Sequence, residues 1–122
     1  MRGILLAWGM LVATPAMAAD RFDLICTAKK TTVHYRVDVP ANEYCAGDCA
    51  VVLKIASASA STLILEDYRP AYRGDDERRT EVNRASGQWH TFSFSPKLDV
   101  TPFTRDGVCE AAPFSGFPTK KF

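Results

Sequence analysis

Apolar residues recur at every second position along two stretches of this chain, residues 22–27 and residues 33–39; the intervening residues are polar except for Ile25. Successive side chains of a β-strand point to opposite faces, so this pattern is typical of a strand with one buried face. No helical period of apolar residues occurs after residue 18. The alternation therefore favours a fold built from sheet and argues against helix packing as the source of the core.

Further strands are expected at residues 51–55, 62–68, 80–83 and 88–94, and residues 98–104 and 108–111 form either a final strand pair or one bent strand. Gly87 permits a tight hairpin between residues 80–83 and 88–94. Residues 57–61 are expected to connect strands, and residues 69–79, with seven charged side chains, form a solvated loop. The sequence predicts an all-β fold, a single antiparallel meander of about seven strands that forms a small barrel or sandwich.

The first 18 residues have the features of a signal peptide. Arg2 precedes an apolar run from Ile4 to Ala13, and the small residues Ala16 and Ala18 follow Pro15. The run is shorter than the roughly 20 apolar residues that a membrane-spanning helix needs. We expect a helical signal peptide over residues 1–18, cleavage after Ala18, a single domain over residues 19–122, and no transmembrane anchor after cleavage.

Charge and composition exclude several classes of function. Removal of Arg2 with the leader leaves 14 Lys and Arg against 14 Asp and Glu, and 47% of the whole chain is hydrophobic. A neutral chain lacks the positive field that attracts nucleic acid, and its apolar content is too high for a disordered segment. We expect no nucleic-acid partner.

The chain has four cysteines, an even number in a protein expected to leave the cytoplasm. Disulfides are favoured in that setting, although the sequence alone does not choose rigorously among three pairings. The Gly47-Asp48 turn favours a bond between Cys45 and Cys49. That bond leaves Cys26 to pair with Cys109, which would staple the terminal strands.

Two other uses of the cysteines have less support. A zinc site of the ribbon type requires two short Cys-x2-Cys knuckles, and this chain has one Cys-x3-Cys pair and scattered histidines. A redox-active pair is expected to have the Cys-x-x-Cys spacing at a helix N-terminus. We therefore expect structural disulfides, no metal and no cofactor.

Candidate catalytic groups are few. His34 lies on the polar side of an alternating stretch and is expected at the surface, and His90 is in phase with Phe92 and Phe94 and is expected to be a partly buried, hydrogen-bonded histidine. The acidic run 75–77 lacks the spacers of a calcium loop. A small periplasmic hydrolase that uses His90 stays an alternative, but we assign no catalytic residue.

The C-terminal segment has an unusual composition for a chain end. Residues 109–122 contain two prolines, a glycine and three phenylalanines. Such a segment either folds back over an open end of the sheet or presents Phe114 and Phe117 to a partner, as aromatic residues do at interfaces.

Several segments together resemble a group of small, uncharacterised exported proteins of Gram-negative bacteria. The shared features are residues 22–26, the 35–38 strand with Cys45 and Cys49 downstream, the 82–87 hairpin, and the ending Cys109-Glu110 followed by Pro113-Phe114-Ser115-Gly116-Phe117-Pro118. The resemblance covers the whole mature chain. It implies export and a small β-domain but transfers no activity and no catalytic residue.

A weaker resemblance is to the periplasmic inhibitors of C-type lysozyme, which are also disulfide-linked β-barrels. Residues 85–87, Ala-Ser-Gly, followed by Trp89, are similar to a segment of those inhibitors, although Trp89 stands where they have a tyrosine and the spacing to the last cysteine is longer. This resemblance implies lysozyme inhibition as an alternative function and adds Trp89 to the candidate partner-binding residues.

Taken together, these features predict a periplasmic or secreted β-domain that is not an enzyme and that binds a protein or small-ligand partner in the cell envelope. The candidate binding residues are Phe114, Phe117 and Trp89.

Overall fold

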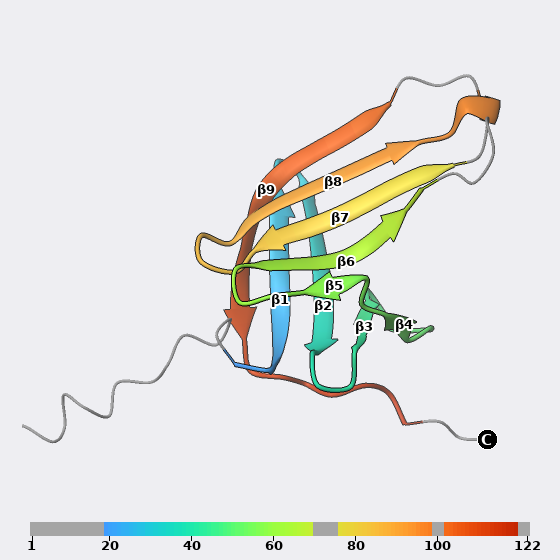
Figure 1. The fold of residues 1–122 in the computed structure, drawn as a ribbon. Helices are drawn as coiled ribbons and strands as arrows, with labels where there is room; N and C mark the ends of the chain where they lie inside the picture. The colour runs from blue at the N-terminus through green and yellow to red at the C-terminus, as the bar shows by residue number, and fades with distance from the viewer. Residues whose placement is uncertain (1–18, 70–75, 99–101, 120–122) are drawn as a thin grey trace, which may run out of the picture.

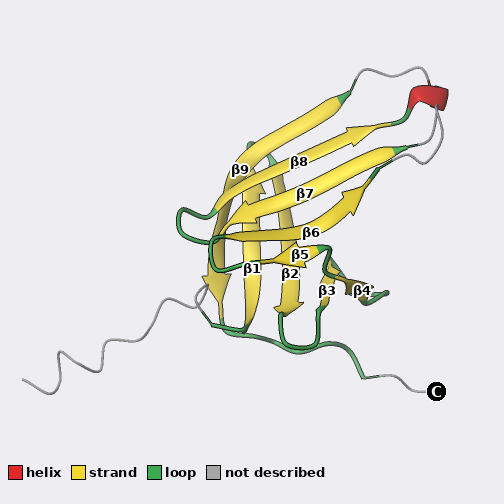
Figure 2. Cartoon of the chain, in the orientation of Figure 1, coloured by secondary structure: helices red, strands yellow, loops and turns green. Residues whose placement is uncertain are grey.

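The computed structural model describes residues 19–69, 76–98 and 102–119, so the expected signal peptide lies outside the described residues. The described chain contains nine β-strands and one short 3-10 helix (Figure 2). The elements are β1 (Arg21–Ala28), β2 (Thr31–Asp38), β3 (Glu43–Ala46), β4 (Leu53–Lys54), β5 (Ser57–Ala58), β6 (Thr62–Tyr68), β7 (Glu77–Asn83), β8 (Gln88–Phe94), η2 (Pro96–Leu98) and β9 (Phe103–Ala112).

All nine strands belong to one antiparallel sheet in the order β4-β3-β2-β1-β9-β8-β7-β6-β5. The sheet curls, because β6 to β9 cross the direction of β1 to β3 (Figure 1). The short segment between β4 and β5 contacts both ends of the sheet: the Ile55 amide donates to the Asn42 carbonyl, and the Ala56 amide donates to the Leu65 carbonyl. The fold is therefore all-β, as the alternation predicts.

The strand count differs from the expected seven for two local reasons. Residues 43–46, for which the sequence predicts no strand, form β3 because they pair with β2, with Cys45 opposite Arg36. The expected strand at residues 51–55 is reduced to β4, because the chain leaves β3 at Ile55 to reach the other end of the sheet. Ser57 and Ala58, expected in a connection, then pair with β6 as β5.

The last strand is one bent strand rather than a strand pair. Residues 103–108 of β9 pair with β8, and residues 108–112 pair with β1, so β9 joins the two differently directed parts of the sheet (Figure 1). Gly107 lies at the bend, where a Cβ atom would overlap the Thr27 carbonyl oxygen. Only glycine allows this close approach of two backbones.

The β7–β8 hairpin is confirmed, and the charged loop before it is shorter than expected. Gly87 has φ +80° in the turn, and the Gly87 amide donates to the Asn83 carbonyl. Residues 77–79 belong to β7 instead of the loop, because Arg78 and Arg79 lie opposite Tyr68 and Asp67 on β6. Residues 70–75 lie outside the described part of the chain.

The core fills the inside of the curl. Alternate residues of β1, β2, β6, β7 and β8 supply most of its side chains, as the period of two requires. The largest fully buried side chains are Trp89, Phe22, Leu24, Leu63, Leu65, Val37 and Val82.

Two disulfides bond the four cysteines in the pairs that the sequence favours, Cys26 with Cys109 and Cys45 with Cys49. The first joins directly opposite positions of β1 and β9, 83 residues apart in the chain. The second closes the short loop after β3. Disulfides of this kind are typical of proteins in oxidising compartments.

Candidate functional site

The C-terminal tail, residues 113–119, leaves β9 and runs along one end of β1, β2 and β3 (Figure 1). Side chains of two strands hold it there. The Ser115 amide donates to Asp23 Oδ1 of β1 at 3.1 Å, and Arg36 Nη1 of β2 donates to the Gly116 carbonyl at 2.8 Å. The tail therefore has a defined path over the sheet.

Asp23 is the centre of the attachment, which we call the Asp23 clasp (Asp23, His34 and Ser115). The Ser115 hydroxyl donates to Asp23 Oδ2 at 2.6 Å, and His34 Nε2 donates to the same oxygen at 2.8 Å. Asp23 is 3% exposed and is the one buried charged residue among those described. Burial raises the pKa of Asp23, but the hydrogen bonds from Ser115 and the pairing with His34 outweigh it, so the pKa lies below its ordinary value.

The clasp contains the three residue types of a serine hydrolase in an arrangement that does not activate the serine. A catalytic triad places the histidine between the hydroxyl and the carboxylate. Here the carboxylate of Asp23 lies in the middle and accepts from both partners. A carboxylate with a lowered pKa is a weak base, so the cluster holds the tail in place and does not generate a nucleophile.

The sequence patterns do not reveal the clasp. His34 is expected to be an ordinary surface residue; its side chain is 41% exposed, yet it is bonded to a buried carboxylate. Asp23 alternates with Phe22 and Leu24, which places it on the outer face of β1, where the returning tail and His34 cover it. The unusual composition of residues 113–118 is the one available signal that something covers this face.

A hollow of about 610 Å³ lies between the tail and the segment that follows the second disulfide. We call it the tail groove. It is lined by Glu43, Cys49, Ala50, Val51, Val52, Phe117, Pro118 and Thr119. Apolar side chains therefore form much of its wall.

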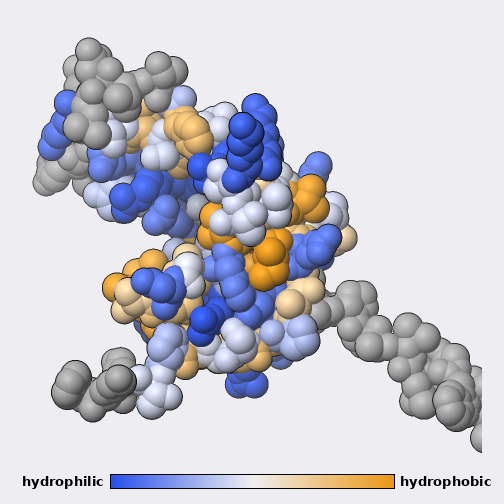
Figure 3. Space-filling view, turned by 180° about the vertical axis from the view of Figure 1, so that it is seen from behind, coloured by the Kyte–Doolittle hydropathy of each residue, from blue (hydrophilic) through white to orange (hydrophobic). Residues whose placement is uncertain are grey.

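Three consecutive apolar residues are exposed beside the groove. Val51 is 63% exposed, Val52 is 37% exposed and Leu53 is 44% exposed. Viewed from behind, the molecule has a cluster of apolar side chains at its surface over the β3–β4 end (Figure 3). Contiguous exposed apolar residues in a folded protein are typical of interaction surfaces.

The three aromatic residues that the sequence predicts to bind a partner differ in their exposure and in their neighbours. Phe114 and Phe117 are half-buried and pack edge to face, with ring centroids 5.5 Å apart, and Phe117 lines the tail groove. Trp89 is 1% exposed and packs edge to face against Tyr35 inside the curl. Phe117 is thus available to a partner in the groove, and Trp89 is part of the core.

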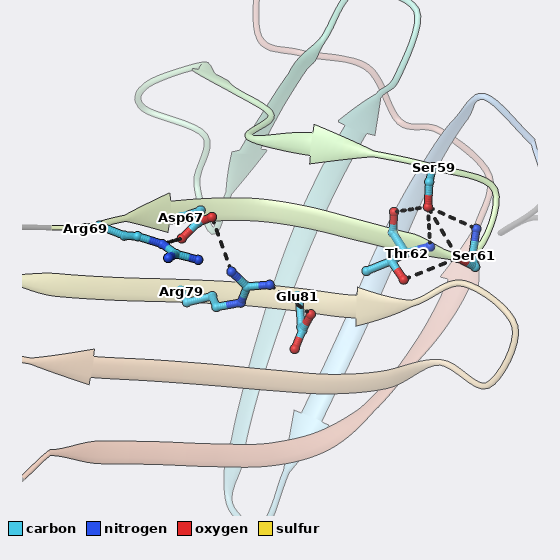
Figure 4. Close-up of polar contacts among 7 residues, drawn as sticks. All are labelled: Ser59, Ser61, Thr62, Asp67, Arg69, Arg79 and Glu81. Atoms are coloured by element: carbon cyan, nitrogen blue, oxygen red, sulfur yellow. Dashed lines mark hydrogen bonds and ion pairs between the residues drawn. The ribbon is translucent and has the colours of Figure 1, made fainter.

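The surroundings of His90 form a second hollow, of about 400 Å³, on the outer face of β6, β7 and β8. His90 Nδ1 donates to Asp106 Oδ1 at 2.6 Å, so the expected hydrogen bond of this half-exposed histidine is present. Arg79 lies beside Asp67 and Glu81 in the same hollow (Figure 4). The described residues that line it, Asp67, Arg69, Glu77, Arg78, Arg79, Glu81, His90 and Phe92, include no serine, threonine or cysteine.

In the described ranges, no group of three or more His, Cys, Asp or Glu side chains is placed to hold a metal ion. No helix within residues 19–69, 76–98 and 102–119 has both the length and the apolar character needed to cross a membrane.

Comparisons with protein-family models, with curated proteins and with solved structures found no match to this chain.

Proposed function

We propose that this protein is an exported, non-enzymatic binding protein that holds an apolar polypeptide segment of a cell-envelope partner in the tail groove. The observation that carries the proposal is the exposed apolar run Val51, Val52 and Leu53 beside a hollow of about 610 Å³ that Phe117 also lines. Burying such residues against a partner is the main favourable contribution to most protein association.

Both walls of the tail groove are held in place by bonds within the protein itself. The Asp23 clasp and the hydrogen bond from Arg36 to the Gly116 carbonyl hold the two tail residues that lie between Phe114 and Phe117. The Cys45–Cys49 disulfide fixes the opposite wall. A site whose walls are already ordered loses less conformational entropy on binding.

A polypeptide fits this place better than a small molecule. β4 is two residues long and stands at one end of the sheet order, so one of its edges faces no other strand of the described chain. Its pairing with β3 begins at Leu53, and Val51 and Val52 precede the paired residues. A short end strand with an open edge and apolar side chains can pair with an extended segment of another chain.

We also propose that the protein is exported from the cytoplasm and that its curled sheet closes into a small barrel. The leader-like residues 1–18 and the two disulfides support passage to the periplasm or beyond. The bonds of Ile55 and Ala56 to opposite ends of the sheet support a small barrel rather than a sandwich. In that arrangement the tail and the groove lie outside the barrel wall.

Selection of random peptides displayed on phage against the immobilised full chain tests this function. We expect apolar peptides to be enriched, and Val51→Lys to weaken the best of them at least tenfold, about 1.4 kcal/mol, in calorimetry. Val108→Lys is the matched control, because Val108 is also an exposed valine, at 55%, but lies away from the groove on β9. Failure to enrich any peptide, or equal weakening by the two valine variants, would contradict the proposal.

Inhibition of C-type lysozyme is a second proposal, favoured by the β7–β8 turn. Ala85 and Ser86 lie at its tip, and their amides both donate to Asn83 Oδ1 at 2.9 Å, which holds the turn in one shape. A rigid exposed turn suits insertion into the cleft of an enzyme. Unchanged lysis of a cell-wall suspension by C-type lysozyme at micromolar concentrations of this protein would remove the proposal.

A further inference from the structure

A third hollow lies on the inner side of the sheet's far end, about 390 Å³ in volume, between the β1–β2 turn and the first half of β9. We call it the Arg105 hollow. Its lining includes Ala28, Lys29, Thr31, Phe103, Arg105 and Asp106.

Arg105 differs from the other arginines that the structure describes. The guanidinium groups of Arg21, Arg36, Arg69, Arg78, Arg79 and Arg84 each contact a carboxylate or a backbone carbonyl. Arg105 is half-buried and makes neither an ion pair nor a hydrogen bond with the described residues. A partly desolvated guanidinium without an anionic partner is a ready recognition group for an oxyanion.

Two aromatic rings hold this guanidinium in position. Its carbon lies 5.1 Å from the Phe103 ring centroid and 5.8 Å from the Trp89 ring centroid. Both distances are within the range of cation–π attraction, which orients the flat group without neutralising its charge. The donors of Arg105 therefore stay available to a ligand.

The other lining residues of the Arg105 hollow indicate which chemical group would be attached to an oxyanion bound by Arg105. Phe103 is 52% exposed, which leaves a ring surface free for an apolar group. Lys29 lies in the two-residue turn between β1 and β2, whose geometry accounts for its φ of 51°, and adds a second cation to the lining. Among these lining residues Asp106 carries the one negative charge, and its carboxylate is bonded to His90 on the opposite face of the sheet.

We propose that the Arg105 hollow is a second ligand site, which binds a carboxylate or phosphate group carried on an apolar body. Arg105 would donate to the oxyanion, Lys29 would add charge at the rim, and the apolar body would lie on Phe103. The site is separate from the tail groove and takes ligands of different chemistry.

Backbone amide NMR shifts of the full chain, titrated with benzoate, phenyl phosphate, benzamide and inorganic phosphate, test this site. We expect benzoate or phenyl phosphate to move the amides of residues 28–31 and 103–107 with at least tenfold higher affinity than neutral benzamide or bare phosphate. The ratio of benzoate to phenyl phosphate affinity identifies which oxyanion the site prefers. Equal affinity of benzamide, equal affinity of bare phosphate, or shifts scattered over all arginines would overturn the proposal.

Two variants separate the site from general ionic attraction. Arg105→Gln is expected to weaken benzoate and phenyl phosphate at least tenfold, and Phe103→Ser to weaken them less. Arg21→Gln is the control, because Arg21 is an exposed arginine whose partner is Asp38 at the opposite end of β1. Unchanged affinity in a folded Arg105→Gln protein would also overturn the proposal, whatever the tail groove binds.

Discussion

The two ends of the curled sheet are built differently. At the stapled end, which comprises β1, β2, the second half of β9 and the tail, Cys26 is bonded to Cys109 and Asp23 is buried beneath Ser115. At the open end, which comprises the far halves of β6 to β9, Tyr68 and Phe103 are 46% and 52% exposed. The stapled end therefore contains the long disulfide and the buried carboxylate and borders the tail groove, whereas the open end has large exposed side chains and no disulfide among the described residues.

Removing the long disulfide should give the largest loss at the stapled end. In the chain-entropy model, Cys26→Ala with Cys109→Ala costs about 4.5 kcal/mol of unfolding free energy, and Cys45→Ala with Cys49→Ala costs about 2 kcal/mol, because the closed loops differ greatly in length. Urea denaturation of both double variants measures the difference. An equal or reversed order would contradict the larger contribution of the long disulfide to stability.

A methyl group at the bend of β9 should be the next most damaging change. Gly107→Ala places its Cβ against the Thr27 carbonyl, a backbone group that has no room to move, and we expect a loss of about 3 kcal/mol. Gly47→Ala serves as the control, since Gly47 has φ +63° but no atom within 4 Å of the place that a Cβ would occupy, and it should lose about 1 kcal/mol. Thermal unfolding measures both losses, and an equal loss in the two variants would contradict the account of the bend.

The Asp23 clasp should contribute less, and in a manner that depends on pH. Asp23→Asn removes charged hydrogen bonds and should cost about 2 kcal/mol at neutral pH. Because folding lowers the pKa of Asp23 below its ordinary value of 3.8, the contribution is present above that pH and is lost as the pH falls through the lower folded value.

Unfolding free energies of the wild type and Asp23→Asn should therefore converge in acid. Asp106→Asn breaks the other Asp–His pair, whose carboxylate side chain is 77% exposed, and should change stability by less than about 0.5 kcal/mol. A gap between wild type and Asp23→Asn that stays constant down to strongly acidic pH would rule out this role of the carboxylate.

Substitution at the open end should have the smallest effect on stability. Phe103→Ser alters a half-exposed ring at the start of β9 and should change the unfolding free energy by no more than about 0.5 kcal/mol. Chemical denaturation measures this change. A loss comparable with that of Gly107→Ala would show that the open end is part of the folded core after all.

Much of the fold follows from local patterns in the sequence. Alternation identifies β1 and β2, Gly87 identifies the β7–β8 hairpin, and the cysteine spacing favours the two disulfides that are present. β3 is missed because its four residues contain no clear alternation and become a strand only by pairing with β2. Short strands of this kind depend on their neighbours, which a local pattern does not contain.

The candidate site is predictable only in part. The composition of the tail points to Phe114 and Phe117, and Phe117 does line the tail groove. The sequence does not reveal that Val51 lines the same groove, because the two residues are far apart in the chain and meet only when the tail returns along β1 to β3. Trp89 is predicted to be a binding residue, yet the curl of the sheet encloses it in the core.

The central claim, that the tail groove at the stapled end binds a polypeptide and the open end does not, can be tested most directly by mapping where a bound peptide lies. The tightest peptide from the phage selection is titrated into the isotope-labelled full chain, and the backbone amide shifts are recorded. We predict shifts in residues 43–53 and 115–119, with residues 103–107 unchanged. Shifts centred on residues 103–107, or absent from the tail, would contradict the assignment of polypeptide binding to the tail groove.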